Sequence, residues 1–332
     1  MDAAVAIRSV EFFHSAARRA AEVDGEQGQG NQWTLIFYGG EPTLNYSALE
    51  AAARRARDLA FPGELKISMV TNGTLLDDSI VRLVKECDID VSVSLDGPRE
   101  VTDHSRNTGT YDRTLTGFRL LRDSGLRPGI SCTLPASSLD EFEGILDWLL
   151  ATGVSGLGFN FMARPGSGYD SPEYCFRATT LLIQAFKTFR ERGIYEDRIM
   201  RKVRAFAEQR VYPFDCAACG GHQVVVAPDG QVGICHAYLG SRHTFVGSVH
   251  DRTFIPEEHE VWREWSRRSP LNIPICSKCS CLGICGGGCP TAQPDDIWQV
   301  TEGFCAHART VLSWLIWDLF EHTRKESTDW NC

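Results

Sequence analysis

The chain has 332 residues, of which 43% are hydrophobic and 23% are charged, an ordinary composition for a globular protein with a substantial core. Its formal net charge of -9 argues against nucleic-acid binding, because a phosphate backbone favours basic surfaces. Met1 to Ala21 reads as an amphipathic helix rather than a secretory signal, and the apolar run 310–320 is too short to span a bilayer. We therefore expect a cytoplasmic protein with neither a nucleic-acid nor a membrane partner.

Apolar periodicity predicts helices alternating with strands as far as residue 161. The first helix covers residues 3–21, and the first strand covers residues 33–38. The following elements are helix 46–59, strand 65–70, helix 78–87, strand 90–95, helix 114–123, strand 129–134, helix 140–152 and strand 156–161. Five strands separated by four helices predict an α/β fold whose parallel sheet has helical crossovers.

Polar and glycine-rich turns follow three of these strands. They are Gly39-Gly40-Glu41-Pro42, Thr71-Asn72-Gly73-Thr74 and Asp96-Gly97-Pro98. Any one of them is explained by a simple chain reversal. Because the carboxyl ends of parallel strands meet at one edge of the sheet, several such turns in register favour a ligand site there.

The second half of the chain is organised differently. Residues 162–175 are predicted to form a loop, followed by a helical linker and then a cysteine-rich segment that begins near Tyr212. We accordingly predict three domains, at 1–175, 176–211 and 212–332. Four aromatic residues of the C-terminal segment, Phe304, His307, Trp314 and Trp317, have helical spacing and are expected in the core, and Tyr174, Trp262 and Trp265 are expected to be packing residues.

Ten of the thirteen cysteines lie beyond Cys175, and five of them fall between Cys276 and Cys289. The glycines among these five leave too little apolar surface to order the segment, so we expect bonds to sulfur to order it. A cytosolic compartment disfavours disulfides and favours metal ligation. A β-hairpin turning at Pro228-Asp229-Gly230 would bring Cys235 beside Cys216 and Cys219. The spacing alone is compatible with structural zinc or with [4Fe-4S] clusters.

The cysteine pattern resembles the SPASM domain of radical SAM enzymes. From Cys219 onwards it reads C-x10-G-x4-C, then C-x2-C-x5-C-x3-C, then a final cysteine. The resemblance extends upstream, where Tyr38 to Pro42 is similar to the GGEP turn of that family, Thr71 to Leu76 to its TNGTLL turn, and Ser94 to Pro98 with Arg106 to its SLDGP…R segment. It implies a partial (β/α)6 barrel lacking its first strand, followed by a small SPASM domain with a β-hairpin.

The resemblance also implies the cofactors and their ligands. S-adenosyl-L-methionine (SAM) would contact residues of the three turns, namely Gly39, Gly40, Glu41, Pro42, Asn72, Ser94, Asp96 and Arg106. For Glu41, a hydrogen bond to the SAM amine and a role in bracing the turn both remain open. Two auxiliary [4Fe-4S] clusters would be held, the first by Cys216, Cys219, Cys235 and Cys289, and the second by Cys276, Cys279, Cys285 and Cys305. Cys281 falls outside the pattern, Cys87, Cys132 and Cys175 are expected in the core or at the surface, and Cys332 lies at the terminus.

A third, catalytic [4Fe-4S] cluster is expected from the family in a C-x3-C-x2-C loop, and no such spacing occurs before Cys216. The chain opens on what should be the first helix of the barrel. We expect that the natural chain begins upstream of Met1, because the turns and the eight cysteines are intact. A non-catalytic relative is the alternative.

The function implied by the resemblance is modification or cross-linking of a ribosomally made peptide or of a protein side chain by a 5′-deoxyadenosyl radical. A donor such as flavodoxin or ferredoxin would supply the electrons. Sulfatase-maturing members carry Asp where this chain has His236, which disfavours but does not remove that alternative. His236 is the candidate catalytic base or substrate contact, and a structural hydrogen bond is the competing role. A SAM-inactive, iron–sulfur-bearing peptide-binding or electron-transfer partner is a further alternative.

Overall fold

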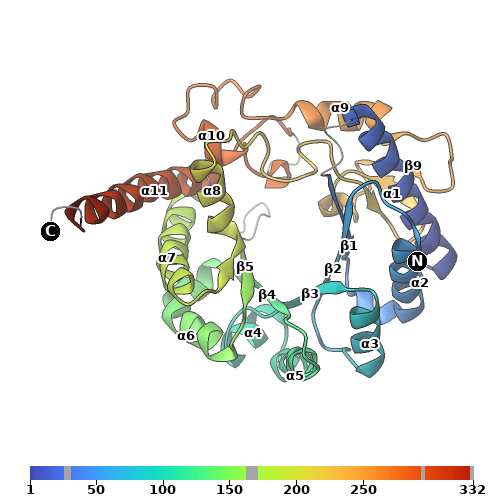
Figure 1. Cartoon of the computed structure of the whole chain (residues 1–332), viewed down its shortest axis with the longest axis horizontal. Coiled ribbons are helices and arrows are strands. Elements are labelled where there is room, and N and C mark those ends of the chain that lie inside the picture. The colour runs from blue at the N-terminus through green and yellow to red at the C-terminus, as the bar shows by residue number, and fades with distance from the viewer. Residues whose placement is uncertain (26–30, 162–170, 293–295, 330–332) are drawn as a thin grey trace. The chain divides into compact units, whose positions relative to one another are not determined.

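The computed structural model describes residues 1–25, 31–161, 171–292 and 296–329 (Figure 1). Contacts divide the chain into two compact units. Unit 1 comprises Met1–Cys132, Trp148–Leu157 and Gln223–Arg263, and unit 2 comprises Thr133–Asp147, Gly158–His222 and Glu264–Cys332. The three domains predicted from the sequence are a different division, based on motifs, and they stay a prediction.

The central element is a six-stranded sheet in the order β1-β2-β3-β4-β5-β6. The strands are β1 (Gln32–Phe37), β2 (Glu64–Thr71), β3 (Ile89–Ser94), β4 (Gly129–Leu134), β5 (Gly156–Phe161) and β6 (Tyr195–Glu196). The first four strands pair in parallel, with Gln32 opposite Glu64, Ile67 opposite Ile89, and Ser92 opposite Gly129. The predicted α/β class with a parallel sheet is confirmed.

Eight helices of the described residues precede, connect or follow these strands. They are α1 (Ala3–Asp24), α2 (Tyr46–Asp58), α3 (Asp78–Glu86), α4 (Arg99–Arg106), α5 (Thr110–Asp123), α6 (Phe142–Thr152), α7 (Pro172–Glu191) and α8 (Asp197–Ala207). Short 3-10 turns follow β1 at Pro42–Asn45 and precede α6 at Ala136–Glu141. None of the described helices is long and apolar enough to cross a membrane.

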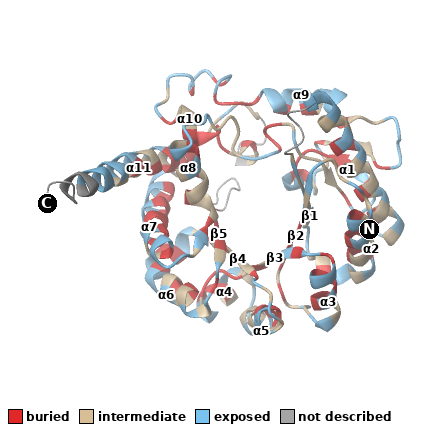
Figure 2. Ribbon diagram, in the orientation of Figure 1, coloured by how far each residue is buried: buried red, intermediate tan, exposed pale blue. Residues whose placement is uncertain are grey.

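The core of unit 1 forms where alternating strand residues meet one face of each helix. β2 buries Ile67 and Met69, and α3 buries Ile80 and Leu83, which are three residues apart (Figure 2). α2 buries a face made mainly of alanines, which allows α1 to pack closely against it. This arrangement leaves the turns at the carboxyl ends of β1, β2 and β3 available for a site.

The remaining part of unit 1 is a three-stranded antiparallel sheet formed by β7 (Val225–Val226), β8 (Gln231–Gly233) and β9 (Phe245–Ser248). The hairpin between β7 and β8 turns at Gly230, whose φ of 86° is accessible to glycine at little cost. The predicted hairpin is therefore confirmed. A short 3-10 turn, His236–Tyr238, follows β8.

Unit 2 is largely helical. The long C-terminal helix α11 (Glu302–Asp329) packs against α7, and the rings of Phe186 and Trp314 meet edge to face at 5.6 Å. Its short elements are the helix α10 (Leu282–Cys285) and the 3-10 turn Pro290–Ala292, while α9 (Glu260–Arg267) and the 3-10 turn Pro256–Glu258 precede them in the chain.

Several sequence predictions need correction. Trp317 is not a core residue, because its side chain is 62% exposed. Apolar residues surround α11 at this point, and only one side of the helix is buried. The predicted loop ends earlier than 175, since α7 begins at Pro172; residues 162–170 lie outside the described residues, as does Cys332. The helical linker is two helices with β6 between them. Tyr174, Trp262 and Trp265 are buried as predicted.

The helix α4 was not predicted. Only Val101 and Thr102 of its eight residues are buried, so its sequence has no apolar stripe. Pro98 at its N-terminal boundary was the available signal, because proline is common where helices begin.

Candidate functional site

The carboxylate of Glu41 joins the turn after β1 to the turn after β2. Its Oε1 accepts hydrogen bonds from the backbone N of Thr43 at 3.1 Å and from the hydroxyls of Thr43 and Thr71, both at 2.6 Å. Its Oε2 accepts from the backbone N of Asn72 at 2.7 Å. Both oxygens are engaged within the protein, so the geometry favours the bracing role that the sequence left open.

The glycines before Glu41 leave backbone uncovered. Gly39 has a φ of 141°, and a side chain added at Gly39 or Gly40 would meet no atom within 4 Å. This space is suited to a ligand that approaches the main chain directly. The amino group of SAM, which the resemblance assigns to this turn, fits such a cradle.

Hydrogen bonds within the turn after β2, and one to α5, fix its shape. The Oδ1 of Asn72 accepts from the backbone N and hydroxyl of Thr74 at 2.9 and 2.8 Å, and the carbonyl of Asn72 accepts from the hydroxyl of Thr114 at 2.7 Å. Gly73, with a φ of 72°, lies so close to Gly117 of α5 that a Cβ on Gly117 would stand 2.1 Å from the carbonyl oxygen of Gly73. Asn72 thus shapes its own turn.

The third turn carries an ion pair. Asp96 is 1% exposed, and its carboxylate accepts from Arg106 Nε at 2.7 Å, Arg106 Nη2 at 2.9 Å and the Ser105 hydroxyl at 2.6 Å. The Arg106 side chain remains 26% exposed. Asp96 therefore orients a guanidinium that still reaches the surface, and Ser94 ends β3 two residues before it.

His236 lies against Tyr38, the residue immediately before the Gly39 turn. The two ring centroids are 4.9 Å apart with an interplanar angle of 59°. Burial lowers the pKa of His236, which favours the neutral imidazole. Tyr38 is 55% exposed despite its place at the end of a strand, and sequence reasoning gave no signal for this contact.

Three of the four cysteines predicted for the first cluster lie together in unit 2. The Sγ atoms of Cys216 and Cys219 are 3.6 Å apart, and the Sγ of Cys289 lies 3.0 Å from the Thr291 hydroxyl. The hydrogen bond from Cys219 lowers the pKa of Cys216 to about 7. Burial raises the pKa of Cys289, and the charge of Cys216 adds to that rise. The fourth cysteine, Cys235, belongs to unit 1, and its joining this set stays a prediction.

The four cysteines predicted for the second cluster all belong to unit 2. Burial raises the pKa of Cys276, and the charges of Cys305 and Cys279 raise it further. Burial likewise raises the pKa of Cys285 to about 12, to which Cys305 also contributes. Burial raises the pKa of Cys281 to about 11, and Cys279 adds to it, so Cys281 lies near this set as well. The donor chemistry, several neighbouring buried thiols, fits an iron–sulfur cluster.

In the described part of the chain, no three Cys, His, Asp or Glu side chains converge on a point as ligands of one metal ion would. A [4Fe-4S] cluster separates its cysteines by a core of iron and sulfide. The finding therefore bears on a mononuclear site and leaves the cluster assignment as a prediction.

Two buried cations hold the cysteine-bearing loops of unit 2. Lys202 is 3% exposed, and its Nζ donates to the carbonyl of Cys285 at 2.9 Å and to Asp215 at 3.3 Å. Arg268 is 0% exposed and donates to the carbonyls of Gly287 and Gly288 at 2.9 and 2.8 Å. Sequence reasoning missed both residues, because lysine and arginine are rarely fully buried.

The loop that Arg268 binds has an unusual backbone. Gly286, Gly287 and Gly288 have φ values of 74°, 79° and 73°, a left-handed run that side chains disfavour. A Cβ on Gly286 would also stand 2.5 Å from the backbone N of Asp215. The three glycines between Cys285 and Cys289 are thus required by the shape of the loop.

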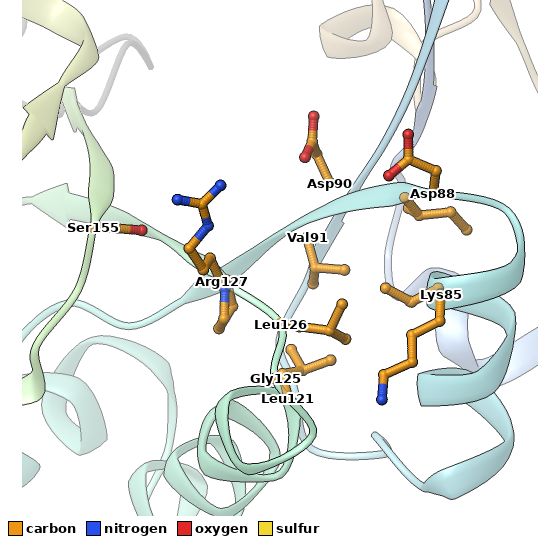
Figure 3. A pocket seen from close by; sticks show the side chains of 12 residues that line it. Lys85, Asp88, Asp90, Val91, Leu121, Gly125, Leu126, Arg127 and Ser155 are labelled. Atoms are coloured by element: carbon orange, nitrogen blue, oxygen red, sulfur yellow. The ribbon is translucent and has the colours of Figure 1, made fainter.

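A cavity of about 500 Å³ lies elsewhere in unit 1 (Figure 3). It is formed around the start of β3 and the segment between α5 and β4, at the amino ends of the strands. Its lining includes Lys85, Asp88, Asp90, Arg127 and Ser155. None of the predicted site residues lines it, and we assign it no ligand.

Comparison with known proteins adds to this geometry. Residues 11–149 match the family model described as the radical SAM superfamily. The chain is 26% identical over 290 residues to Fe-coproporphyrin III synthase of Methanosarcina barkeri, covering 76% of this chain and 70% of that protein. It is 24% identical over 272 residues to the serine-type anaerobic sulfatase-maturating enzyme of Klebsiella aerogenes, covering 77% of this chain and 66% of that protein.

A solved structure has a similar fold. The structure described as native anSMEcpe with bound AdoMet and Cp18Cys peptide matches with a TM-score of 0.73 at 18% identity, covering 95% of this chain and 91% of that one. The likeness shows that this chain shares the fold of that structure. The chain spans about two thirds of the length of the two curated relatives, so its complete activity is a matter for proposal.

Proposed function

We propose that this protein, whose residues 11–149 match the radical SAM superfamily, is a SPASM-type maturase that modifies or cross-links a ribosomally made peptide or a protein side chain. The contact between Tyr38 and His236 carries the proposal. It places the segment after Cys235 beside the turn proposed to bind SAM, within one unit. The 3-10 turn that follows β8 thus contacts the residue that immediately precedes the proposed SAM-binding turn.

The proposed SAM site uses the three strand-end turns. The backbone of Gly39 and Gly40 receives the amino group, and Pro42 closes the turn. Arg106 and Ser94 contact the cofactor from the third turn. When bound, SAM supplies the 5′-deoxyadenosyl group that becomes the hydrogen-abstracting radical.

Three polar residues of the site act by positioning. Glu41 and Asn72 hold the first two turns at fixed geometry, and Asp96 aims the guanidinium of Arg106. Their hydrogen bonds are already made within unit 1, so SAM would meet a preorganised surface. Preorganisation lowers the cost of binding because fewer groups must be ordered when the ligand arrives.

The proposed auxiliary clusters use the eight cysteines in the two sets given above, and they would supply electron transfer when present. Cys216, Cys219, Cys235 and Cys289 hold one cluster, and Cys276, Cys279, Cys285 and Cys305 hold the other. Flavodoxin or ferredoxin is the proposed electron donor. His236, whose pKa is lowered by burial and whose ring contacts that of Tyr38, is the proposed substrate contact or base.

A peptide substrate is supported by the two maturase comparisons, one of which is a structure with a bound peptide. Fe-coproporphyrin III synthase has the higher identity of the two curated relatives, so a porphyrin is the competing substrate class. The sulfatase-type activity remains less favoured because His236 replaces the expected Asp.

The first experiment measures cofactors on anaerobically purified protein. About eight iron and eight sulfide per chain are expected from two [4Fe-4S] clusters. Calorimetry should show SAM binding that is weakened at least tenfold by Arg106→Gln and unaffected by Arg99→Gln, whose exposed guanidinium pairs with Asp112. Stoichiometric zinc without iron would overturn the cluster assignment, and absent SAM binding would favour the SAM-inactive partner.

The second experiment addresses the substrate. The longest reading frame containing this chain is incubated with dithionite, SAM and each short peptide encoded beside its gene, and products are read by mass spectrometry. A mass change in one peptide with release of 5′-deoxyadenosine is the expected result. Formation of iron coproporphyrin III from a tetrapyrrole precursor, with no change in any peptide, would contradict the proposal.

A further inference from the structure

Arg268 is a fully buried cation, and its hydrogen-bond partners among the described residues are all backbone carbonyls. Besides the carbonyls of Gly287 and Gly288, its guanidinium donates to those of Ile297 and Gln299, the latter at 3.1 Å. Its five N–H groups are thus largely satisfied as hydrogen-bond donors. These hydrogen bonds do not neutralise the positive charge of Arg268, because a carbonyl group is a dipole and carries no net charge.

No carboxylate of the described residues lies within ion-pair distance of Arg268, whereas the other buried cation of unit 2, Lys202, pairs with Asp215 at 3.3 Å. Burying an uncompensated charge costs several kcal/mol, and buried arginines are normally paired. Among the residues that the structure describes, the buried positive charge of Arg268 therefore has no carboxylate as its counter-charge.

Cysteines of both predicted sets flank the backbone that Arg268 binds, because Gly287 and Gly288, whose carbonyls accept from its guanidinium, stand between Cys285 and Cys289.

The loop that Arg268 binds also joins the two sets. Gly287 and Gly288 lie between Cys285, assigned to the second cluster, and Cys289, assigned to the first. The Sγ of Cys219 donates to the same Gly288 carbonyl that accepts from Arg268, at 3.9 Å. One guanidinium is therefore central to the cysteine-bearing part of unit 2.

We propose that Arg268 is a positioning residue that supplies the shared counter-charge for both auxiliary clusters and raises their reduction potentials. The inference rests on the two clusters of the proposed function. A cluster with four thiolate ligands is anionic, and accepting an electron makes it more so without breaking a bond. A nearby buried cation stabilises the reduced form more than the oxidised form, so its removal should shift both potentials to more negative values.

The test is a redox titration of the auxiliary clusters, followed by electron paramagnetic resonance, with dithionite as the reductant. In Arg268→Gln we expect the ratio of reduced to oxidised cluster at a fixed potential to fall at least tenfold for both clusters, which corresponds to about 59 mV for a one-electron couple. Arg267→Gln is the matched control, because it removes the same charge from the adjacent, exposed position. That variant should titrate like the parent.

Arg268→Lys keeps the positive charge but has fewer N–H donors for the carbonyls. It therefore distinguishes the effect of the charge from the effect of the hydrogen bonds that hold the loop. Parent-like potentials in this variant support the proposal, including the case in which Arg268→Gln loses its iron. Full iron content with unchanged potentials in Arg268→Gln would overturn it. Loss of iron from both variants, or equal shifts in both, would also overturn it, since Arg268 would then act through its hydrogen bonds.

These results are distinguishable from failure of the proposed function. If the parent protein holds no iron, the cluster assignment has failed. If the parent holds both clusters and the titrations of the variants match it, only the role of Arg268 has failed.

Discussion

In unit 1 the sequence motifs are held by anions, and in unit 2 they are held by cations. Glu41 and Asp96 accept hydrogen bonds from amide, hydroxyl and guanidinium groups around the strand-end turns. Lys202 and Arg268 donate to the carbonyls of the loop between Cys285 and Cys289. Both arrangements fix glycine-rich backbone, and they differ in how the charge is compensated.

The anions of unit 1 have their donors within the unit, and Asp96 has its counter-ion there as well. The site they form is geometrically complete without a ligand. Arg268 in unit 2 has acceptors but no carboxylate among the residues that the structure describes. The difference teaches that buried charges can hold glycine-rich turns in two ways: as an ion pair, as Asp96 does with Arg106, or through backbone carbonyls, as Arg268 does among the described residues.

The largest effect is expected from breaking the cation-bound loop. Gly286→Ala would force a side chain into a left-handed backbone and against the backbone of Asp215, costing about 4 kcal/mol of unfolding free energy. Urea unfolding would measure it. Gly283→Ala is the control, because its Cβ would meet nothing within 4 Å in α10, and its stability should be equal or slightly higher. Equal effects of both variants would contradict the account of this loop.

Breaking the buried anion of unit 1 should have the next largest effect. Asp96→Asn leaves Arg106 without its counter-ion and should cost about 3 kcal/mol, measured as a lowered urea midpoint. Asp112→Asn is the matched control, because Asp112 also binds an arginine, Arg99, through two oxygens but is exposed. It should have little effect on stability. A comparable loss in the control would mean that burial does not explain the strength of the Asp96 pair.

The smallest effect is expected at the link between the first two turns. Glu41→Gln replaces one acceptor oxygen with an amide nitrogen, which cannot accept a hydrogen bond, so a donor such as the backbone N of Asn72 loses its partner at a cost of about 2 kcal/mol. Thermal unfolding would detect the change. Glu50→Gln, which alters an exposed pair with Arg54, should unfold like the parent. If the two variants behave alike, Glu41 does not brace the turns.

Much of the fold could be predicted because the local pattern and the global structure agree in unit 1. The strand 90–95 and the helix 78–87 each lie within about one residue of β3 and α3, since their apolar residues repeat at the period of the element. The helix α4 was not predicted because most of its residues are polar or charged, which leaves no apolar stripe. Trp317 was wrongly assigned to the core because the apolar residues of α11 surround the helix. Periodicity locates a face only where one face is apolar.

The site divides in the same way. The turns and the cysteine spacings are local patterns, and the sequence identified them. The contact of His236 with Tyr38 and the burial of Arg268 depend on residues far apart in the chain, and nothing in their neighbouring sequence marks them. For Glu41 the sequence predicted the position but not the role, because only the hydrogen bonds of the structure distinguish bracing of the turn from ligand binding.

The left-handed run Gly286–Gly288 also limits how the sequence of this loop can vary. Its shape depends on the backbone preferences of glycine and on the contacts with Arg268. Cys285 and Cys289 stand on either side of the run. A side chain at any of the three positions would therefore change how far apart, and in which direction, the chain presents these two thiols.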